Sequence, residues 1–288
     1  MEILENLVLK NGVHKWKGIA NGHGFTLLCG NSADALTEIQ DESVDCVVTS
    51  PPYYSLRDYG VEGQIGLEDT VELYVNSICE VMDEVFRVLR KDGLLFLNLG
   101  DTYYSGKGMS HGQDQKSHKR RFGLRPVDKS GGLGANIGRK SVIGIPWRVA
   151  IGMIHRNWIL RAPIIWHRDK TLPESVKDRP RRSYEYVFMF AKDRKYYFDR
   201  SVLVEEQIDE DVWTIVPRPS GSEINTAPYP DELVERCLSI GCRPNGVVLD
   251  PFVGSGTTMK VALSSNREAI GIDISREFCE YALQHLEV

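Results

Sequence analysis

The sequence predicts an α/β protein with a mostly parallel sheet and helices on both of its faces. Short apolar runs alternate with helical patterns in the first hundred residues, and the same alternation returns from residue 230 to the end. Strands that alternate with helices favour parallel pairing. No internal repeat and no clear linker interrupts the chain, so residues 1–288 are expected to form a single domain.

The first elements lie before residue 101. Strands are predicted at 25–30, 44–50 and 94–100, and the last two are apolar enough to be buried on both faces. Helices are predicted at 32–39 and 71–89, the second from apolar residues at helical spacing. Ser32 is the expected N-cap of the shorter helix, and the glycine of "KDG" (91–93) is expected to end the longer one.

Regular structure resumes at residue 145, after a break. A helix at 145–156 has Pro146 in its first turn, and "PDELVERCLSIG" (230–241) is a second helix. Strands are predicted at 157–168, 183–192, 246–250 and 268–274. Helices follow at 257–266 and from the last strand to about residue 286. Polar connections are expected at 169–183 and 199–223.

Composition excludes several classes of protein. Hydrophobic residues make up 42% and charged residues 26% of the chain, as in ordinary globular domains, and no apolar run approaches a membrane span. No signal peptide is recognisable, so a cytoplasmic location is expected. The six cysteines form no C-x-x-C pair, which favours buried reduced thiols over disulfides or a structural metal site.

A strand, a glycine turn and a helix follow one another in "VVLDPFVGSGTTMKVAL" (247–263). Glycines let a ligand approach the backbone, and a helix N-terminus presents free N–H groups. The next strand ends in Asp273, seventeen residues after Gly256, where a carboxylate can accept both hydroxyls of a ribose. These features predict a site for a cofactor that contains a nucleoside.

The spacing separates the candidate cofactors. A Walker A loop is excluded because Thr257 and Thr258 follow Gly256 where Lys and Ser or Thr are required. NAD is disfavoured because Met259 replaces the third glycine of its fingerprint. A purely structural glycine turn is disfavoured because the whole string occurs together with Asp273. S-adenosylmethionine, a nucleoside without phosphate, fits best.

A second unusual stretch is "TSPPYY" (49–54), at the end of a predicted strand. Two consecutive prolines cannot donate hydrogen bonds to a sheet, so the strand must end there. Two aromatic residues follow at once, where a turn normally has small polar ones.

Together the two strings resemble the motifs of the DNA amino-methyltransferases, which transfer a methyl group from S-adenosylmethionine to an exocyclic base nitrogen. "SPPY" (50–53) looks like the family's catalytic tetrapeptide, and "DPFVGSGTT" (250–258) looks like its cofactor loop. The tetrapeptide comes first, which is the order of the circularly permuted β class. The resemblance extends over most of the chain and implies a Rossmann-like methyltransferase fold with a small DNA-recognition region.

The resemblance also implies roles for individual residues. The catalytic corner would consist of Ser50, Pro51, Pro52 and Tyr53. The cofactor would be bound by Asn31, Asp250, Phe252, Gly254, Ser255, Gly256, Thr257 and Asp273. The chain departs from many family members in having Gly30-Asn31 in place of Gly-Asp, and Asn225-Thr226 where a His is usual. The resemblance therefore does not establish the contacts with the cofactor that are expected at these two positions.

The corner has features that suit amino methylation. An exocyclic amino group is a poor nucleophile, and acceptors on its N–H bonds, such as Ser50 Oγ and the Pro51 carbonyl, would make it more tetrahedral. Tyr53 offers a face for a base flipped out of the duplex, a contact worth about 1–3 kcal/mol. Tyr54 is either a second wall or a core residue. Carbon-5 methylation is excluded because no cysteine follows a proline, so direct in-line transfer without a metal is expected.

The first residue of the tetrapeptide bears on the target base. Within the family, Ser before Pro-Pro is typical of N4-cytosine enzymes and Asp of many N6-adenine enzymes, so Ser50 favours cytosine, with adenine as the alternative. Ser50 and the motif order disfavour a protein-glutamine or RNA methyltransferase. The intact motifs disfavour a catalytically inert DNA-binding relative.

The glycine-rich stretch 101–144 is the candidate DNA-binding loop. Within 107–140, nine Lys or Arg stand against two Asp, in a chain with a formal charge of −5. Double-stranded DNA is the expected partner, and its phosphates would be contacted by Lys119, Arg120, Arg121, Arg139 and Lys140. Residues 192–224 are a short candidate for the target-recognition insert. The sequence leaves open a cognate restriction endonuclease and a homodimer.

Overall fold

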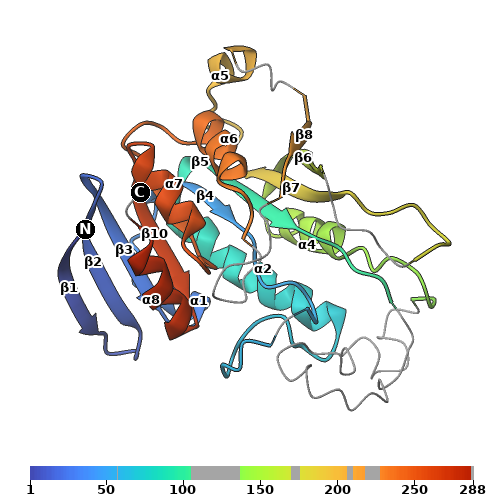
Figure 1. Ribbon diagram of the computed structural model, residues 1–288, viewed down its shortest axis with the longest axis horizontal. Coiled ribbons are helices and arrows are strands. Elements are labelled where there is room, and N and C mark those ends of the chain that lie inside the picture. The colour runs from blue at the N-terminus through green and yellow to red at the C-terminus, as the bar shows by residue number, and fades with distance from the viewer. Residues whose placement is uncertain (57, 105–136, 170–175, 206–209, 218–227, 287–288) are drawn as a thin grey trace.

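The computed structural model describes residues 1–56, 58–104, 137–169, 176–205, 210–217 and 228–286. This part of the chain forms a ten-stranded sheet in the order β1-β2-β3-β10-β9-β4-β5-β7-β6-β8 (Figure 1). The strands are β1 (Glu2–Val8), β2 (His14–Ala20), β3 (His23–Cys29), β4 (Val44–Thr49), β5 (Leu89–Leu99), β6 (Ile159–Arg168), β7 (Tyr184–Ala191), β8 (Val212–Ile215), β9 (Val247–Asp250) and β10 (Glu268–Asp273). The helices are α1 (Ser32–Leu36), α2 (Val71–Val88), α4 (Ile145–Ile154), α5 (Arg200–Glu205), α6 (Asp231–Gly241), α7 (Thr257–Ser264) and α8 (Arg276–Gln284).

The five central strands, from β3 to β5, run parallel, and antiparallel pairs flank them on both sides. This arrangement confirms the predicted α/β fold with a largely parallel sheet. Parallel strands are buried on both faces, which explains why β4 and residues 94–99 of β5 are mostly apolar.

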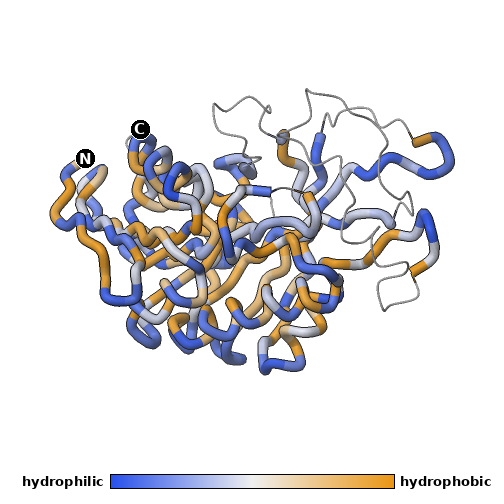
Figure 2. Tube along the Cα trace, turned by 90° about the horizontal axis from the view of Figure 1, so that it is seen from below, coloured by the Kyte–Doolittle hydropathy of each residue, from blue (hydrophilic) through white to orange (hydrophobic). Residues whose placement is uncertain are grey.

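Helices cover the sheet on both faces. Val47 and Leu95 pack into a core with α1, α2 and α4, whereas their neighbours Val48 and Phe96 pack into a second core with α6, α7 and α8. Successive residues of a strand point to opposite faces, so each strand contributes to both cores. Figure 2 shows apolar stretches running through the interior, with hydrophilic segments around the outside. In the described parts of the chain, no helix has the length and apolarity needed to cross a bilayer.

The chain reverses its direction of travel across the sheet between β9 and β4. From β9 it continues through α7 to β10 on one side, and from β4 it continues through α2 to β5 on the other. Ligands of open α/β sheets bind outside the carboxyl ends of the strands at such a switch point. The strings after β4 and β9, two hundred residues apart in the sequence, therefore meet there.

Several local predictions were wrong. Asn31, not Ser32, caps α1 with its side chain, while Ser32 Oγ donates to the Pro251 carbonyl. Gly93 does not end α2, because the helix stops at Val88 and β5 begins at the next residue. The connection predicted at 199–223 contains α5 and β8, and β1 and β2 form an antiparallel hairpin that no sequence pattern had indicated.

Candidate active site

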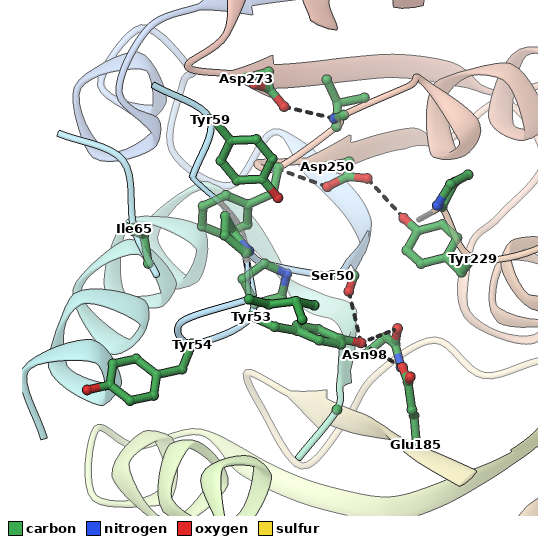
Figure 3. Close-up of a pocket in the computed structure, with 18 of the residues that line it drawn as sticks. Ser50, Tyr53, Tyr54, Tyr59, Ile65, Asn98, Glu185, Tyr229, Asp250 and Asp273 are labelled. Carbon is green, nitrogen blue, oxygen red and sulfur yellow. Dashed lines mark hydrogen bonds between the residues drawn. The ribbon is translucent and has the colours of Figure 1, made fainter. Parts of the chain in front are cut away.

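A cavity of about 540 Å³ opens at the carboxyl ends of β4 and β9. Its lining includes all four residues of the catalytic string and seven of the eight in the predicted cofactor set, namely Asn31, Asp250, Phe252, Gly254, Ser255, Thr257 and Asp273. Gly256 is the member of the set that is not part of the lining. The fold therefore brings the two predicted motifs into one site (Figure 3).

Asp250 ties the two motifs together. Its Oδ1 accepts from Thr49 Oγ1 at 2.6 Å and from Phe252 N at 3.0 Å, and its Oδ2 accepts from Thr258 Oγ1 at 2.6 Å and from the Tyr229 hydroxyl at 2.9 Å. A carboxylate has about four acceptor sites, so these donors occupy them all. Burial raises the pKa of Asp250. The side chain therefore has a structural role in joining the two motifs, and Asp250 also lines the cavity.

Tyr229 is the buried partner of this carboxylate, only 8% exposed. We expect Tyr229→Phe to lower the free energy of unfolding by about 1–3 kcal/mol, because Asp250 loses a donor in the interior. Urea denaturation would measure the change, with Tyr281→Phe on α8 as the matched control. An unchanged unfolding midpoint for Tyr229→Phe would show that the Tyr229 hydroxyl does not stabilise the hydrogen bonding around Asp250.

The cofactor side of the cavity is formed by the glycine turn and the end of β10. Asp273 Oδ2 accepts from Gly254 N at 2.9 Å, and its Oδ1 accepts from Ser275 N at 2.8 Å. Burial raises the pKa of Asp273 to about 6, and the two backbone donors counteract this. The carboxyl group is therefore ionised at neutral pH and retains acceptor capacity toward the cavity.

Two glycines shape this turn. Gly254 and Gly256 have φ of 51° and 88°, where a side chain is disfavoured, and a Cβ on Gly256 would lie 3.0 Å from that of Ala282. The turn thus leaves exposed backbone beside the cavity. An apolar end is supplied by Ile274 and by Tyr59, whose ring meets Phe278 edge-on at 5.5 Å. An open glycine backbone, a carboxylate and an apolar end fit a nucleoside, and the cavity volume is ordinary for a cofactor site.

The catalytic corner is held on several sides. The Tyr74 hydroxyl donates to the Pro52 carbonyl at 2.9 Å, so this carbonyl already has a partner. Gly100 makes room for the Tyr53 ring, because a Cβ there would lie 2.6 Å from a ring carbon. Tyr54 is 3% exposed and packs on Tyr74, so its role is that of a core residue (Figure 3).

Sequence reasoning missed the polar residues around Tyr53. Its hydroxyl donates to Glu185 Oε2 at 2.6 Å, with Asn98 Oδ1 a longer second acceptor at 3.2 Å. Pairing of Thr49 with Leu97 places Asn98 beside Ser50, and pairing of Leu99 with Tyr186 brings Glu185 alongside. Both side chains are buried, at 4% and 9% exposure. The signal that could have revealed Asn98 and Glu185 is that each is a polar residue within an apolar stretch of its strand.

Two arginines complete this side of the cavity. Arg168 Nη1 donates to Glu185 Oε1 at 2.8 Å, and Arg182 Nη1 donates to the Asp101 carbonyl. The Nε atoms of both arginines are buried and have no hydrogen-bond partner within the described residues. A buried donor without a partner is costly, so both are candidates to meet acceptor atoms of a ligand.

The structure describes only two of the five predicted DNA-binding residues, Arg139 and Lys140. Lys119, Arg120 and Arg121 fall outside the described residues, as do 206–209 and 218–224 of the candidate recognition insert. Lys140 is exposed and pairs with Asp178 at 2.5 Å, and Arg139 precedes it. The two ends of the 101–144 stretch are joined by Tyr104 N donating to the Ser141 carbonyl at 2.9 Å.

The fold and the cavity together define an α/β protein with a site that fits a nucleoside cofactor, and comparison with known proteins identifies its family. The model of the N6/N4 methyltransferase family, described as DNA methylase, matches residues 44–284. The chain belongs to this family and is a DNA methyltransferase. This confirms the family predicted from the two motifs.

The chain resembles curated relatives along most of its length. It is 39% identical over 276 residues to the type II methyltransferase M.SmaI of Serratia marcescens, which covers 93% of this chain and 92% of that protein. It is 38% identical over 272 residues to the type II methyltransferase M.Cfr9I of Citrobacter freundii, covering 92% and 88%.

Solved structures confirm the methyltransferase fold. The cytosine-N4-specific PvuII DNA methyltransferase aligns with a TM-score of 0.68 and 20% identity over 90% of this chain and 85% of that one. A protein of Thermus thermophilus, described as a DNA modification methylase and solved with S-adenosyl-L-methionine, aligns with a TM-score of 0.62 and 25% identity over 90% and 92%.

Proposed function

We propose that this enzyme methylates the exocyclic N4 of cytosine at a specific DNA site, with the base flipped into the cavity. The observation that carries the proposal is that Ser50, Tyr53 and the glycine turn line one cavity. Cytosine is favoured over adenine because serine stands at the first position of the tetrapeptide. N6 of adenine is the second candidate, since both bases present an amino group beside a ring nitrogen.

S-adenosylmethionine is the methyl donor, and when bound it supplies an electrophilic methyl carbon. Asp273 would hold its ribose, and Gly254 would let it approach the backbone. Tyr59, Ile274 and Phe278 would pack against its adenine. Asn31 lies at the same end of the cavity, with Oδ1 accepting from Ala33 N at 2.9 Å, which leaves its amide nitrogen for the cofactor.

The catalytic corner would orient the target nitrogen. Ser50 Oγ and the Pro51 carbonyl would accept its two N–H bonds, and the rigid prolines keep the carbonyl in place without reorganisation. The Pro52 carbonyl is the weaker candidate for this role, because it already accepts from Tyr74. Tyr53 would stack on the flipped base, with its ring held by Gly100 at one side and by the hydroxyl at its tip.

DNA would lie across the mouth of the cavity. The basic residues 119–121, 139 and 140 would contact phosphates, and the unpartnered Nε donors of Arg168 and Arg182 would face the flipped nucleotide. Sequence recognition would be shared between 192–224 and the basic loop. A cognate restriction endonuclease, a homodimer and a cytoplasmic location remain predictions, the first supported by relatives named type II methyltransferases.

Incubation with unmethylated DNA and labelled S-adenosylmethionine tests the proposal. Mass spectrometry of the nucleosides should find N4-methylcytosine, and sequencing for modified sites should return one recognition sequence. N6-methyladenine as the sole product would contradict the choice of cytosine. Absence of any labelled nucleoside would contradict the catalytic assignment.

A further inference from the structure

A chain of hydroxyl groups leads from the catalytic serine to a buried carboxylate. Ser50 Oγ lies 3.4 Å from the Tyr53 hydroxyl, which lies 2.6 Å from Glu185 Oε2 (Figure 3). The contact of Ser50 is longer than an ordinary hydroxyl hydrogen bond, so it is the weaker of the two. The three groups belong to the loop after β4 and to β7, so tertiary structure alone assembles them.

The carboxylate fixes the direction of these hydrogen bonds. Glu185 pairs with Arg168 through Oε1 at 2.8 Å, which leaves Oε2 as an acceptor for Tyr53. A carboxylate in an ion pair only accepts, so the single proton of the Tyr53 hydroxyl must point toward Glu185. Burial and the neighbouring charge of Glu185 raise the pKa of Tyr53 well above its ordinary value, so the hydroxyl keeps that proton.

The Asn98 amide supports this arrangement. Its Nδ2 donates to the Tyr186 carbonyl at 3.1 Å and to Glu185 Oε2 at 3.3 Å. These two bonds fix the amide and hold Oε2 in place. Glu185 therefore has donors on both oxygens and cannot rotate without losing them.

The orientation of the Tyr53 hydroxyl also determines the orientation of the Ser50 hydroxyl. With its proton committed to Glu185, the Tyr53 oxygen presents a lone pair to Ser50, and the Ser50 proton turns toward it. The remaining lone pairs of Ser50 then face the cavity. A serine in this state accepts hydrogen bonds from a ligand and does not donate to it.

We propose that Glu185 is a positioning residue that, through Tyr53 and Ser50, makes the site prefer bases with an amino group over their keto counterparts. An amino group donates to Ser50, whereas a keto oxygen in the same place would meet a lone pair. The proposal rests on the proposed function, because it takes Ser50 as the group that meets the target atom. It adds a determinant of selectivity on β7, outside the tetrapeptide.

The test uses duplexes that carry the site identified by sequencing and differ only at the methylated base, which stands opposite an abasic position in both so that pairing does not affect the cost of flipping. The amino base is compared with its keto counterpart: uracil if the product is N4-methylcytosine, hypoxanthine if it is N6-methyladenine. We expect the wild-type protein to bind the amino duplex about tenfold more tightly. An adenine product would correct the proposed base and leave this comparison intact.

Glu185→Gln keeps the shape of the side chain and removes the fixed direction, because an amide can also donate to Tyr53. We expect the preference for the amino duplex to fall toward unity and kcat to fall by about tenfold to a hundredfold, with a smaller change in KM for DNA. Glu235→Gln, an exposed change of the same charge on α6, is the matched control and should leave both quantities unchanged.

Tyr53→Phe separates the proposal from a folding defect, because it leaves the ion pair of Glu185 and Arg168 intact. It should lose the same preference, and the double variant should lose no more than either single one, since both act through one chain of contacts. A full amino preference retained by both variants, or a wild-type protein without any preference, would overturn the role of Glu185.

Discussion

Replacing Ser50 with alanine is expected to lower kcat by about a hundredfold to a thousandfold, the size found when one preorganised catalytic hydrogen bond is removed. The hydroxyl would accept from the amino group as its nitrogen becomes tetrahedral, so its loss affects the transition state more than binding. KM for DNA should change little, because the Tyr53 ring and the contacts to phosphate remain. Single-turnover methylation with labelled cofactor measures the chemical step directly.

Two further variants make the Ser50 result specific. Ser50→Asp restores an acceptor and should recover part of the rate, whereas Ser77→Ala on α2, whose hydroxyl donates within its own helix to Leu73, should have the wild-type rate. A wild-type single-turnover rate for Ser50→Ala would mean that the Pro51 carbonyl suffices.

Replacing Asp273 with asparagine is expected to weaken binding of S-adenosylmethionine by about a hundredfold, since two hydrogen bonds to a charged group are affected. The substitution is nearly isosteric, but the amide can also donate, and the backbone N–H groups of Gly254 and Ser275 already occupy that side. Isothermal titration calorimetry would measure the affinity. An unchanged dissociation constant would remove Asp273 from the cofactor site.

The same carboxyl group predicts how cofactor binding depends on pH. Burial raises its pKa to about 6, so it is ionised and accepting above that pH and protonated below it. Affinity should be full near pH 8 and should fall as the pH drops through 6, by about tenfold per unit well below the pKa. Asp273→Asn should lack this dependence, because nothing at that position titrates. An equal slope in both proteins would assign it to another group.

Local sequence patterns predicted most of the sheet. The helix at 71–89 and the strands at 44–50 and 94–100 were recognisable because each carries its own apolar periodicity, whatever surrounds it. The hairpin of β1 and β2 escaped because its edge strand is mostly exposed, with Leu4 and Leu7 open to solvent, and so carries no burial pattern. β8 is only four residues long and is defined by its pairing with β6.

The candidate site was likewise predicted in part from local sequence and in part missed. Ser50, Tyr53, Gly254 and Asp273 line the cavity as the two motifs predicted. Asp250 belongs to the same motif, and the structure adds that Thr49 and Tyr229, distant in the sequence, donate to its oxygens. A motif fixes the local backbone and the residue types, and it does not fix which distant donors reach a given side chain.

By itself, the sequence determined the α/β class, the order of the two motifs and the kind of cofactor, because these depend on residues close together in the chain. Only the tertiary structure decided that Tyr54 is buried on Tyr74 and that Glu185 meets Tyr53. Glu185 reaches the site through the register of β5, β6 and β7, which pairs residues as far apart as Leu94 and Ala191. Such a register is set by the burial of whole strands, and no short stretch of sequence contains it.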